Sequence, residues 1–158
     1  LVMAGIAQTL WMVKFNDTST KINGYMLRVN SSYLPGTTLP SAKTLKSAVE
    51  FLQTAPQNQP VLAVPYMAGL YYLADRPSPT KYNNILGGEV ATVKDQTDFI
   101  NQVEKNSVTT VVYDPKDNYP DSGLELKTYN PLIHQYIMNT YQTVSTSPEG
   151  WLFMKRKT

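Results

Sequence analysis

The chain has 158 residues, of which 42% are hydrophobic and only 16% are charged, with a formal net charge of +2, one histidine and no cysteine. The absence of cysteine excludes a disulfide framework, a thiolate nucleophile and cysteine-ligated metal, and a single imidazole excludes a multi-histidine metal site. So small a net charge lacks the basic footprint of a nucleic-acid-binding protein, so no nucleic-acid partner is expected.

Residues 1–15 begin with an uncharged, mostly apolar run, LVMAGIAQTLWMV. A membrane-spanning helix needs about 20 residues, so this run is too short to cross a bilayer by itself. Trp11 and Lys14 are typical of the flank of a membrane helix. Three interpretations stay open: the end of a transmembrane helix, a helix packed on the domain, and the remainder of a signal segment. The polar stretch 16–40 is predicted to be a linker or to contain a short strand at Tyr25–Val29.

Regular periodicity begins at Ser41, which is a suitable helix N-cap. Apolar side chains then follow the i, i+3, i+4, i+7 spacing of one helical face, at Leu45, Ala48, Val49 and Leu52. The run Val61–Val64 is continuously apolar and of strand length, which is typical of a strand buried on both faces. Pro65 ends this strand, and a short helix is predicted over 66–74.

Helices and strands continue to alternate in the second half of the chain. Thr92, with Asp95 three residues later, predicts a helix start. The β-branched residues of Val108–Tyr113 predict a second buried strand. Asn130 followed by Pro131 predicts the N-cap and first position of another amphipathic helix.

Two short strands, Tyr141–Val144 and Trp151–Met154, flank a turn at 147–150 and predict a closing hairpin. The preceding alternation of strands and helices predicts parallel strands joined by right-handed crossovers. We therefore expect a single α/β domain over 41–158. Its predicted architecture is a three-layer sandwich with a mostly parallel central sheet and a C-terminal antiparallel hairpin.

Common catalytic and cofactor motifs are absent. The chain has no P-loop and no GxGxxG pattern, so nucleotide binding is not expected. His134 lies between apolar positions of a predicted helix and has no GxSxG nucleophile elbow, which favours a structural role. The spacing of Asp114, Asp117 and Asp121 does not match a calcium loop and is typical of a solvated turn. We expect no catalytic residue, no metal and no cofactor.

The segment 66–82 is the most distinctive part of the sequence and is our candidate for ligand or partner contact. Its candidate contact residues are Tyr66, Tyr71, Tyr72, Asp75, Arg76 and Tyr82. The segment follows the carboxyl end of a predicted strand, where open α/β sheets bind ligands. Tyrosine faces beside an arginine fork suit a sugar or a phosphate group. A structural interpretation stays open, in which Tyr71 belongs to the core and Arg76 holds the loop through Asp75 or through backbone carbonyl groups.

The sequence VLAVPYMAGLYYLADRPSPTKY at 61–82 combines an apolar strand that ends near proline, a tyrosine-rich helix with a terminal arginine, and a Pro-Thr-x-Tyr stretch. It resembles the C-terminal soluble domain of bacterial GT-C membrane glycosyltransferases, which are relatives of protein O-mannosyltransferases and of the aminoarabinose lipid A transferase. Similar elements follow in the same order at 95–105, 108–114, 131–141 and 150–156. Asp75 departs from the pattern, which usually has a small residue before the arginine.

This resemblance implies a parent protein with many membrane helices that transfers a sugar from a polyprenyl-phosphate donor on the extracytoplasmic side of the cell membrane. The catalytic carboxylates of such enzymes lie in their membrane part, so no catalytic residue is carried over to this chain. The resemblance thus implies a non-catalytic extracytoplasmic domain that contacts the membrane domain of its parent chain and assists binding of the acceptor or the lipid-linked sugar donor. The alternative is a free-standing carbohydrate- or ligand-binding α/β module.

Overall fold

A computed structural model describes residues 18–22, 25–29, 40–85, 89–116 and 125–158. The predicted apolar segment 1–15 and two of the loop acids, Asp117 and Asp121, lie outside these ranges. Within the described ranges, no helix combines the length and the apolar character that crossing a bilayer requires.

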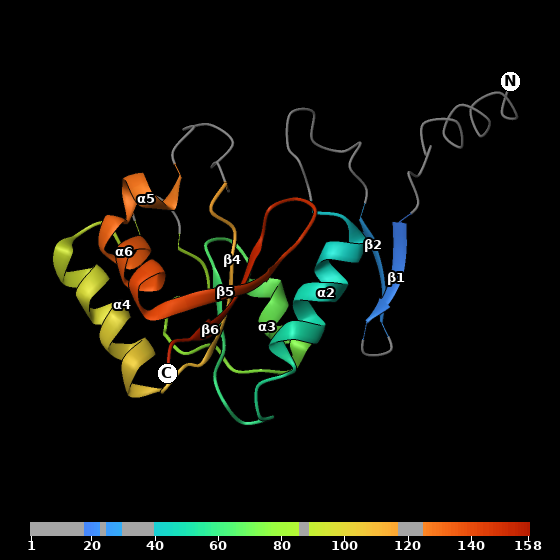
Figure 1. Cartoon of the computed structure of the whole chain (residues 1–158), viewed down its shortest axis with the longest axis horizontal. Coiled ribbons are helices and arrows are strands. Elements are labelled where there is room, and N and C mark those ends of the chain that lie inside the picture. Colours follow the sequence, from blue (N-terminus) through green and yellow to red (C-terminus); the bar gives the residue numbers. More distant parts are fainter. Residues whose placement is uncertain (1–17, 23–24, 30–39, 86–88, 117–124) are drawn as a thin grey trace, which may run out of the picture.

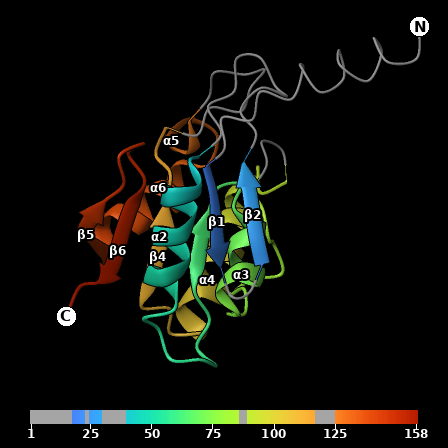
Figure 2. The ribbon, with the colours of Figure 1, turned by 90° about the vertical axis from the view of Figure 1, so that its right-hand side faces the viewer.

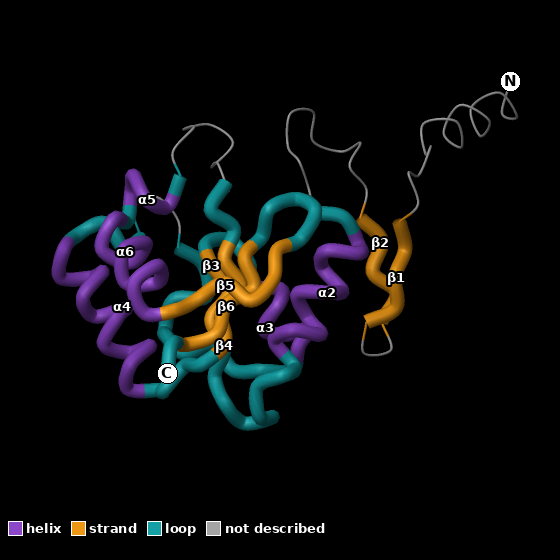
Figure 3. The backbone as a smooth tube through the Cα atoms, in the orientation of Figure 1, coloured by secondary structure: helices purple, strands orange, loops and turns teal. Residues whose placement is uncertain are grey.

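A four-stranded sheet forms the centre of the molecule, and helices lie on both of its sides (Figure 1, Figure 3). Its strands, in spatial order, are β3 (Leu62–Val64), β4 (Thr110–Tyr113), β6 (Leu152–Arg156) and β5 (Tyr141–Thr146). One side carries α2 (Ala42–Leu52) and α3 (Ala68–Ala74), and the other carries α4 (Val93–Lys105), α5 (Leu126–Tyr129) and α6 (Pro131–Thr140). Each side has its own apolar core, so the α/β class expected from the sequence is confirmed.

Only the pairing of β3 with β4 is parallel, because β6 pairs antiparallel with both β4 and β5. The prediction of a mostly parallel sheet is therefore wrong, whereas the C-terminal antiparallel hairpin is confirmed. The tight turn after β5 returns the chain antiparallel, and β6 then inserts between β5 and β4. An apolar run suits a buried strand of either direction, so the strand sequences carry no signal for the direction of pairing.

Local capping signals correctly predicted the starts of α2 and α4. The Ser41 side chain accepts a hydrogen bond from the backbone N of Thr44 at 3.2 Å. The Thr92 hydroxyl oxygen accepts one from the backbone N of Asp95 at 3.1 Å. Both cap residues have the extended backbone that brings a short side chain over the first turn.

The predicted start of α6 is confirmed, with Asn130 at the N-cap position and Pro131 in the first turn, but the Asn130 side chain does not cap the helix. Asn130 has φ −133° and ψ 63°. The side chain of Gln96, which is buried on α4, accepts instead from the backbone N of Leu132 at 3.0 Å. Packing of α4 against α6 thus satisfies a backbone N–H of the first turn that the Asn130 side chain leaves uncapped.

Glu149 ties the turn between β5 and β6 to the start of α2. Its carboxylate accepts hydrogen bonds from the backbone N of Ser41, at 3.2 Å, and from the hydroxyl of Thr44. Burial opposes ionisation of this carboxyl, but the hydrogen bonds from Ser41 and Thr44 outweigh it and lower the pKa of Glu149 to about 2. A negative charge at a helix N-terminus is also favoured by the helix dipole.

A separate hairpin lies beside α2 (Figure 1, Figure 2). It consists of β1 (Thr18–Ile22) and β2 (Tyr25–Val29), which pair antiparallel from Thr18 opposite Val29 to Ile22 opposite Tyr25. The short strand predicted at Tyr25–Val29 is therefore confirmed, and its partner β1 was not predicted.

Candidate functional site

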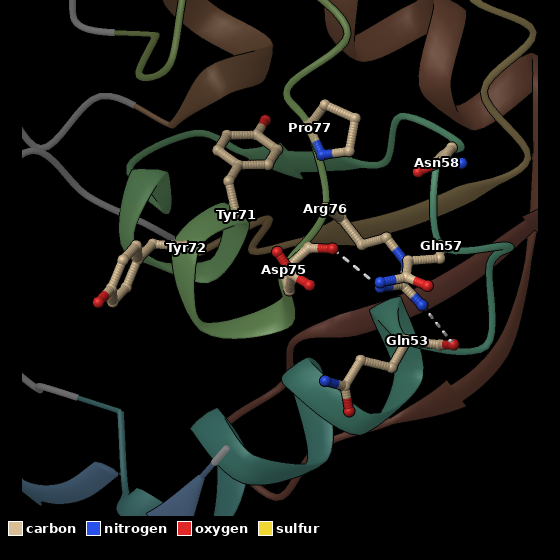
Figure 4. A pocket seen from close by; sticks show the side chains of 8 residues that line it. All are labelled: Gln53, Gln57, Asn58, Tyr71, Tyr72, Asp75, Arg76 and Pro77. Atoms are coloured by element: carbon tan, nitrogen blue, oxygen red, sulfur yellow. Dashed lines mark hydrogen bonds between the residues drawn. The ribbon is translucent and has the colours of Figure 1, made fainter. Parts of the chain in front are cut away.

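An open groove of about 890 Å3 lies between the loop after α2 and the C-terminal end of α3 (Figure 4). We call it the α2–α3 groove. It is lined by Gln53, Gln57, Asn58, Tyr71, Tyr72, Asp75, Arg76 and Pro77. The structure thus brings four of the six predicted contact residues together with three amide side chains that the sequence analysis did not single out.

The groove lies at the amino end of β3, opposite to the end expected from the sequence. The helix α3 starts beyond the carboxyl end of β3, runs back along the strand, and ends at Asp75. The backbone N of Val61, just before β3, donates to the carbonyl of Pro77 at 3.2 Å, which places the end of this segment beside the start of the strand. Asp75 adopts φ 53° and ψ 52° there, a left-handed conformation that aspartate tolerates better than most residues.

The guanidinium group of Arg76 is fully used by the backbone. It makes five hydrogen bonds, of 2.8 to 3.2 Å, to the carbonyl oxygens of Gln53, Ala55, Ala74 and Asp75. A guanidinium has five N–H donors. Arg76 therefore joins the C-terminal ends of α2 and α3 and keeps no donor for an anion.

Tyr71 belongs to the core and contributes only a surface edge to the groove. Its side chain is 8% exposed, and its hydroxyl both accepts from the backbone N of Ala63 at 3.1 Å and donates to the carbonyl of Ala63 at 3.2 Å. Burial raises the pKa of Tyr71 above its ordinary value, so it stays a neutral hydrogen-bonding group. The structural interpretation left open by the sequence is the one observed for Tyr71 and for Arg76.

Besides Pro77, the exposed groups of the groove are an aromatic ring, two amides and a carboxylate. Tyr72, one residue after the buried Tyr71, is 69% exposed on α3. Gln57 and Asn58 are exposed in the loop after α2, and Asp75 is exposed at the end of α3. Together they offer an aromatic face, neutral donors and acceptors, and one anionic acceptor.

Tyr66 and Tyr82 are not among the described residues that line this groove. Tyr66 is half-buried after the carboxyl end of β3. Tyr82 is half-buried, lies 6.4 Å from the ring of Phe99 between centroids, and has the Nζ of Lys81 4.9 Å above its own ring. A second hollow of about 380 Å3 is lined by Lys81, Tyr82, Asn83, Asn84 and Glu89. The sequence segment 66–82 is therefore spread over two places.

His134, the single imidazole, is engaged by a buried tyrosine. Its Nδ1 lies 2.8 Å from the hydroxyl oxygen of Tyr113, at the carboxyl end of β4. Burial, with a further contribution from the charge of Lys127, lowers the pKa of His134 below its ordinary value. Across the described part of the chain, no three His, Asp or Glu side chains gather in a way that would hold a metal ion.

The amides that line the groove have a weak sequence signal. Gln57 and Asn58 belong to the run Gln53-Thr-Ala-Pro-Gln-Asn-Gln59, a polar stretch between a helix and a strand. Such a composition is typical of any loop, so only its proximity to Asp75 in the structure distinguishes it.

Comparisons of this chain with protein families, with curated proteins and with solved structures returned no match.

Proposed function

We propose that this chain is a non-catalytic extracytoplasmic domain of a multi-pass membrane glycosyltransferase with a polyprenyl-phosphate-linked sugar donor, and that the α2–α3 groove binds the sugar of the acceptor. The proposal rests on the family resemblance of residues 61–82 and on the chemistry of the groove. In this role the chain contacts the membrane domain of its parent protein and presents the acceptor to a reaction that takes place in the membrane part.

The choice of an uncharged ligand rests on the hydrogen bonds of Arg76, which already use all of its N–H donors. Phosphate recognition requires cationic donors with free N–H groups. All five donors of Arg76 already bond to carbonyl oxygens, and the carboxylate of Asp75 beside it repels an anion. The groove therefore favours an uncharged, hydroxyl-rich ligand over the phosphate of a lipid-linked donor.

The exposed side chains fit such a ligand. The C–H face of a sugar ring packs against an aromatic ring, and Tyr72 offers one that is 69% exposed. Sugar hydroxyls donate to carboxylates and both donate to and accept from amides, which Asp75, Gln57 and Asn58 supply. The groove is open and has few contact groups, so we expect weak binding, with a dissociation constant of about 1 mM.

Titration of the isotope-labelled chain, followed by backbone NMR, tests this proposal. Methyl α-mannoside and N-acetylglucosamine are the neutral probes, and inorganic phosphate is the anionic one. We expect the sugars to shift the amide signals of residues 57–58 and 72–76, and phosphate to shift none of them.

The matched variants are Tyr72→Ala and Val93→Ala. Both side chains are 69% exposed on helices, but Val93 lies on α4, outside the groove. Tyr72→Ala should abolish the sugar-induced shifts and Val93→Ala should preserve them. Shifts that phosphate produces, or sugar-induced shifts that survive in Tyr72→Ala, would contradict the assignment.

The membrane part of the proposal has a separate test in the gene. We expect the reading frame upstream of Leu1 to encode many membrane-spanning helices. A reading frame that starts near Leu1, combined with sugar binding at the groove, would favour the free-standing carbohydrate-binding module instead.

A further inference from the structure

Lys155, on β6, presents a positive charge on the side of the sheet that carries α2. Its Nζ donates hydrogen bonds to the hydroxyl oxygens of Thr54, at 2.7 Å, and of Thr110, at 2.8 Å. The same atom lies 5.1 Å from the centre of the Phe51 ring. Thr110 is buried, Lys155 is half-buried and Thr54 is exposed. The ammonium group is therefore held at the edge of the core, within reach of solvent.

The charge of Lys155 has no counter-ion in the part of the chain that the structure describes, where the ion pairs join other residues. Burial lowers the pKa of Lys155 below its ordinary value, and no carboxylate acts against this effect. A cation that has lost part of its hydration without gaining an anion is a favourable partner for an anionic ligand.

Two hydrogen-bond donors remain at this place. An ammonium has three N–H groups, of which the two threonines use two. The Thr54 hydroxyl donates in turn to the carbonyl oxygen of Phe51 at 2.7 Å, so it has no proton left for a ligand. Gln142 is exposed and lies directly opposite Lys155 in the pairing of β5 with β6. Opposite residues of an antiparallel pair project from the same face, so the amide of Gln142 supplies a donor beside the third N–H of Lys155.

This place lies across the end of α2 from the α2–α3 groove. Gln53, which lines the groove, donates from its amide to the carbonyl oxygen of Ala74 on α3 at 3.4 Å. The next residue, Thr54, contacts Lys155 on β6. A helix is about 10–12 Å across, so a ligand has to be longer than a single sugar ring to reach both places.

We propose that Lys155 and Gln142 bind a carboxylate of an acidic oligosaccharide whose uncharged part occupies the α2–α3 groove. Their two donors match the two oxygens of a carboxylate, whereas a phosphate group carries more charge and more oxygens than one cation and one amide satisfy. The inference rests on the sugar-binding function proposed for the groove, and it assigns the acceptor to the class of acidic saccharides.

Trigalacturonate and its fully methyl-esterified form are matched probes, because they share one sugar chain and differ in negative charge. NMR titration of the whole isotope-labelled chain should give a dissociation constant about fivefold lower for the acid, which is the gain expected from one partly exposed ion pair. The acid, and not the ester, should also shift the side-chain amide signals of Gln142. It should raise the pKa of Lys155, because a bound carboxylate stabilises the ammonium form.

Two variants remove the site and one serves as the control. Lys155→Met keeps an unbranched apolar side chain beside Phe51 but removes the charge, and should abolish the difference between acid and ester. Gln142→Glu, at an exposed position, places a carboxylate opposite Lys155 and should have the same effect, also where Lys155→Met does not fold. Lys94→Met removes a positive charge from an exposed position of α4, on the other side of the sheet, and should preserve the fivefold difference.

Equal binding of acid and ester would overturn this inference and leave sugar binding at the groove intact. An acid preference that survives in Lys155→Met, or that disappears in Lys94→Met, would also overturn it. If neither form shifts the amide signals of residues 57–58 and 72–76, the proposed function fails as well. Inorganic phosphate that shifts the Lys155 signals, when the acid does not, would refute the assignment of a carboxylate.

Discussion

Replacing Arg76 by lysine tests whether this side chain stabilises the fold or binds an anion. The guanidinium makes five hydrogen bonds to four carbonyl groups, and an ammonium has only three donors without the planar fork. At least two bonds are therefore lost, each of which contributes about 1.5–3 kcal/mol when the donor is charged. Because Arg76 is partly exposed, hydrogen bonds to water compensate for about half of this lost free energy. We therefore expect Arg76→Lys to lower the free energy of unfolding by about 2 kcal/mol.

Thermal unfolding followed by circular dichroism measures this effect. For a domain of this size, 2 kcal/mol corresponds to a decrease in Tm of about 4–8 °C. Arg156→Lys is the control, since that guanidinium bonds the carboxylate of Glu104 at the surface, at 2.8 and 2.9 Å, where a pair contributes about 0–1 kcal/mol. An unchanged Tm in Arg76→Lys, together with phosphate binding by the wild type that the variant lacks, would refute the structural role of Arg76.

Three further predictions concern stability. Glu149→Gln should lower the free energy of unfolding by about 1 kcal/mol at neutral pH, after allowance for solvent screening of this exposed carboxylate. Since the pKa of Glu149 in the fold is about 2, below the ordinary 4.5, its contribution is present above pH 4.5 and is lost as the pH falls towards 2. The free energy of unfolding, measured by denaturation at a series of acidic pH values, should therefore fall less steeply with pH in the variant than in the wild type. The lowered pKa of His134 means that the unfolded chain binds a proton more readily, so the wild type should lose stability as the pH falls below 6.5, and chemical denaturation of His134→Gln should show a smaller loss over that range. Gly69→Ala should raise the free energy of unfolding by about 0.5–1 kcal/mol, because alanine favours the helix more than glycine does. A Cβ at this helical position meets no atom within 4 Å, so the substitution introduces no clash, and a Tm below that of the wild type would contradict the prediction.

The helices and the buried strands were largely predictable because their signals are local. The apolar positions of α2 recur at helical spacing, and Ala48, Val49 and Leu52 are buried as that pattern requires. The caps of α2 and α4 depend on side chains three residues from the backbone groups that they satisfy. The start of α6 at Pro131 was also predicted, but the side chain that caps it was not, because it is Gln96, 36 residues before Leu132 and on another helix.

The sequence predicted the segment that contributes to the site, but not which of its residues are exposed in the groove. Tyr71 and Tyr72 are identical neighbours in the sequence, yet one is 8% and the other 69% exposed, because successive residues of a helix point about 100° apart and only packing decides which direction is the core. Arg76 was open to two interpretations, and the choice depended on carbonyl groups of Gln53 and Ala55 more than 20 positions earlier. The groove amides Gln57 and Asn58 follow from the same long-range approach.

By itself, then, the sequence determined the α/β class, the positions of most helices and strands, and the lack of cysteine or multi-histidine chemistry, since these depend on residue type and on spacing within one or two turns. Only the tertiary structure decided the direction of strand pairing, the position of β5 at the end of the four-stranded sheet and the composition of the groove. Each of these is a relation between segments distant in the chain, where packing and backbone hydrogen bonds select one arrangement among several that suit the same local pattern.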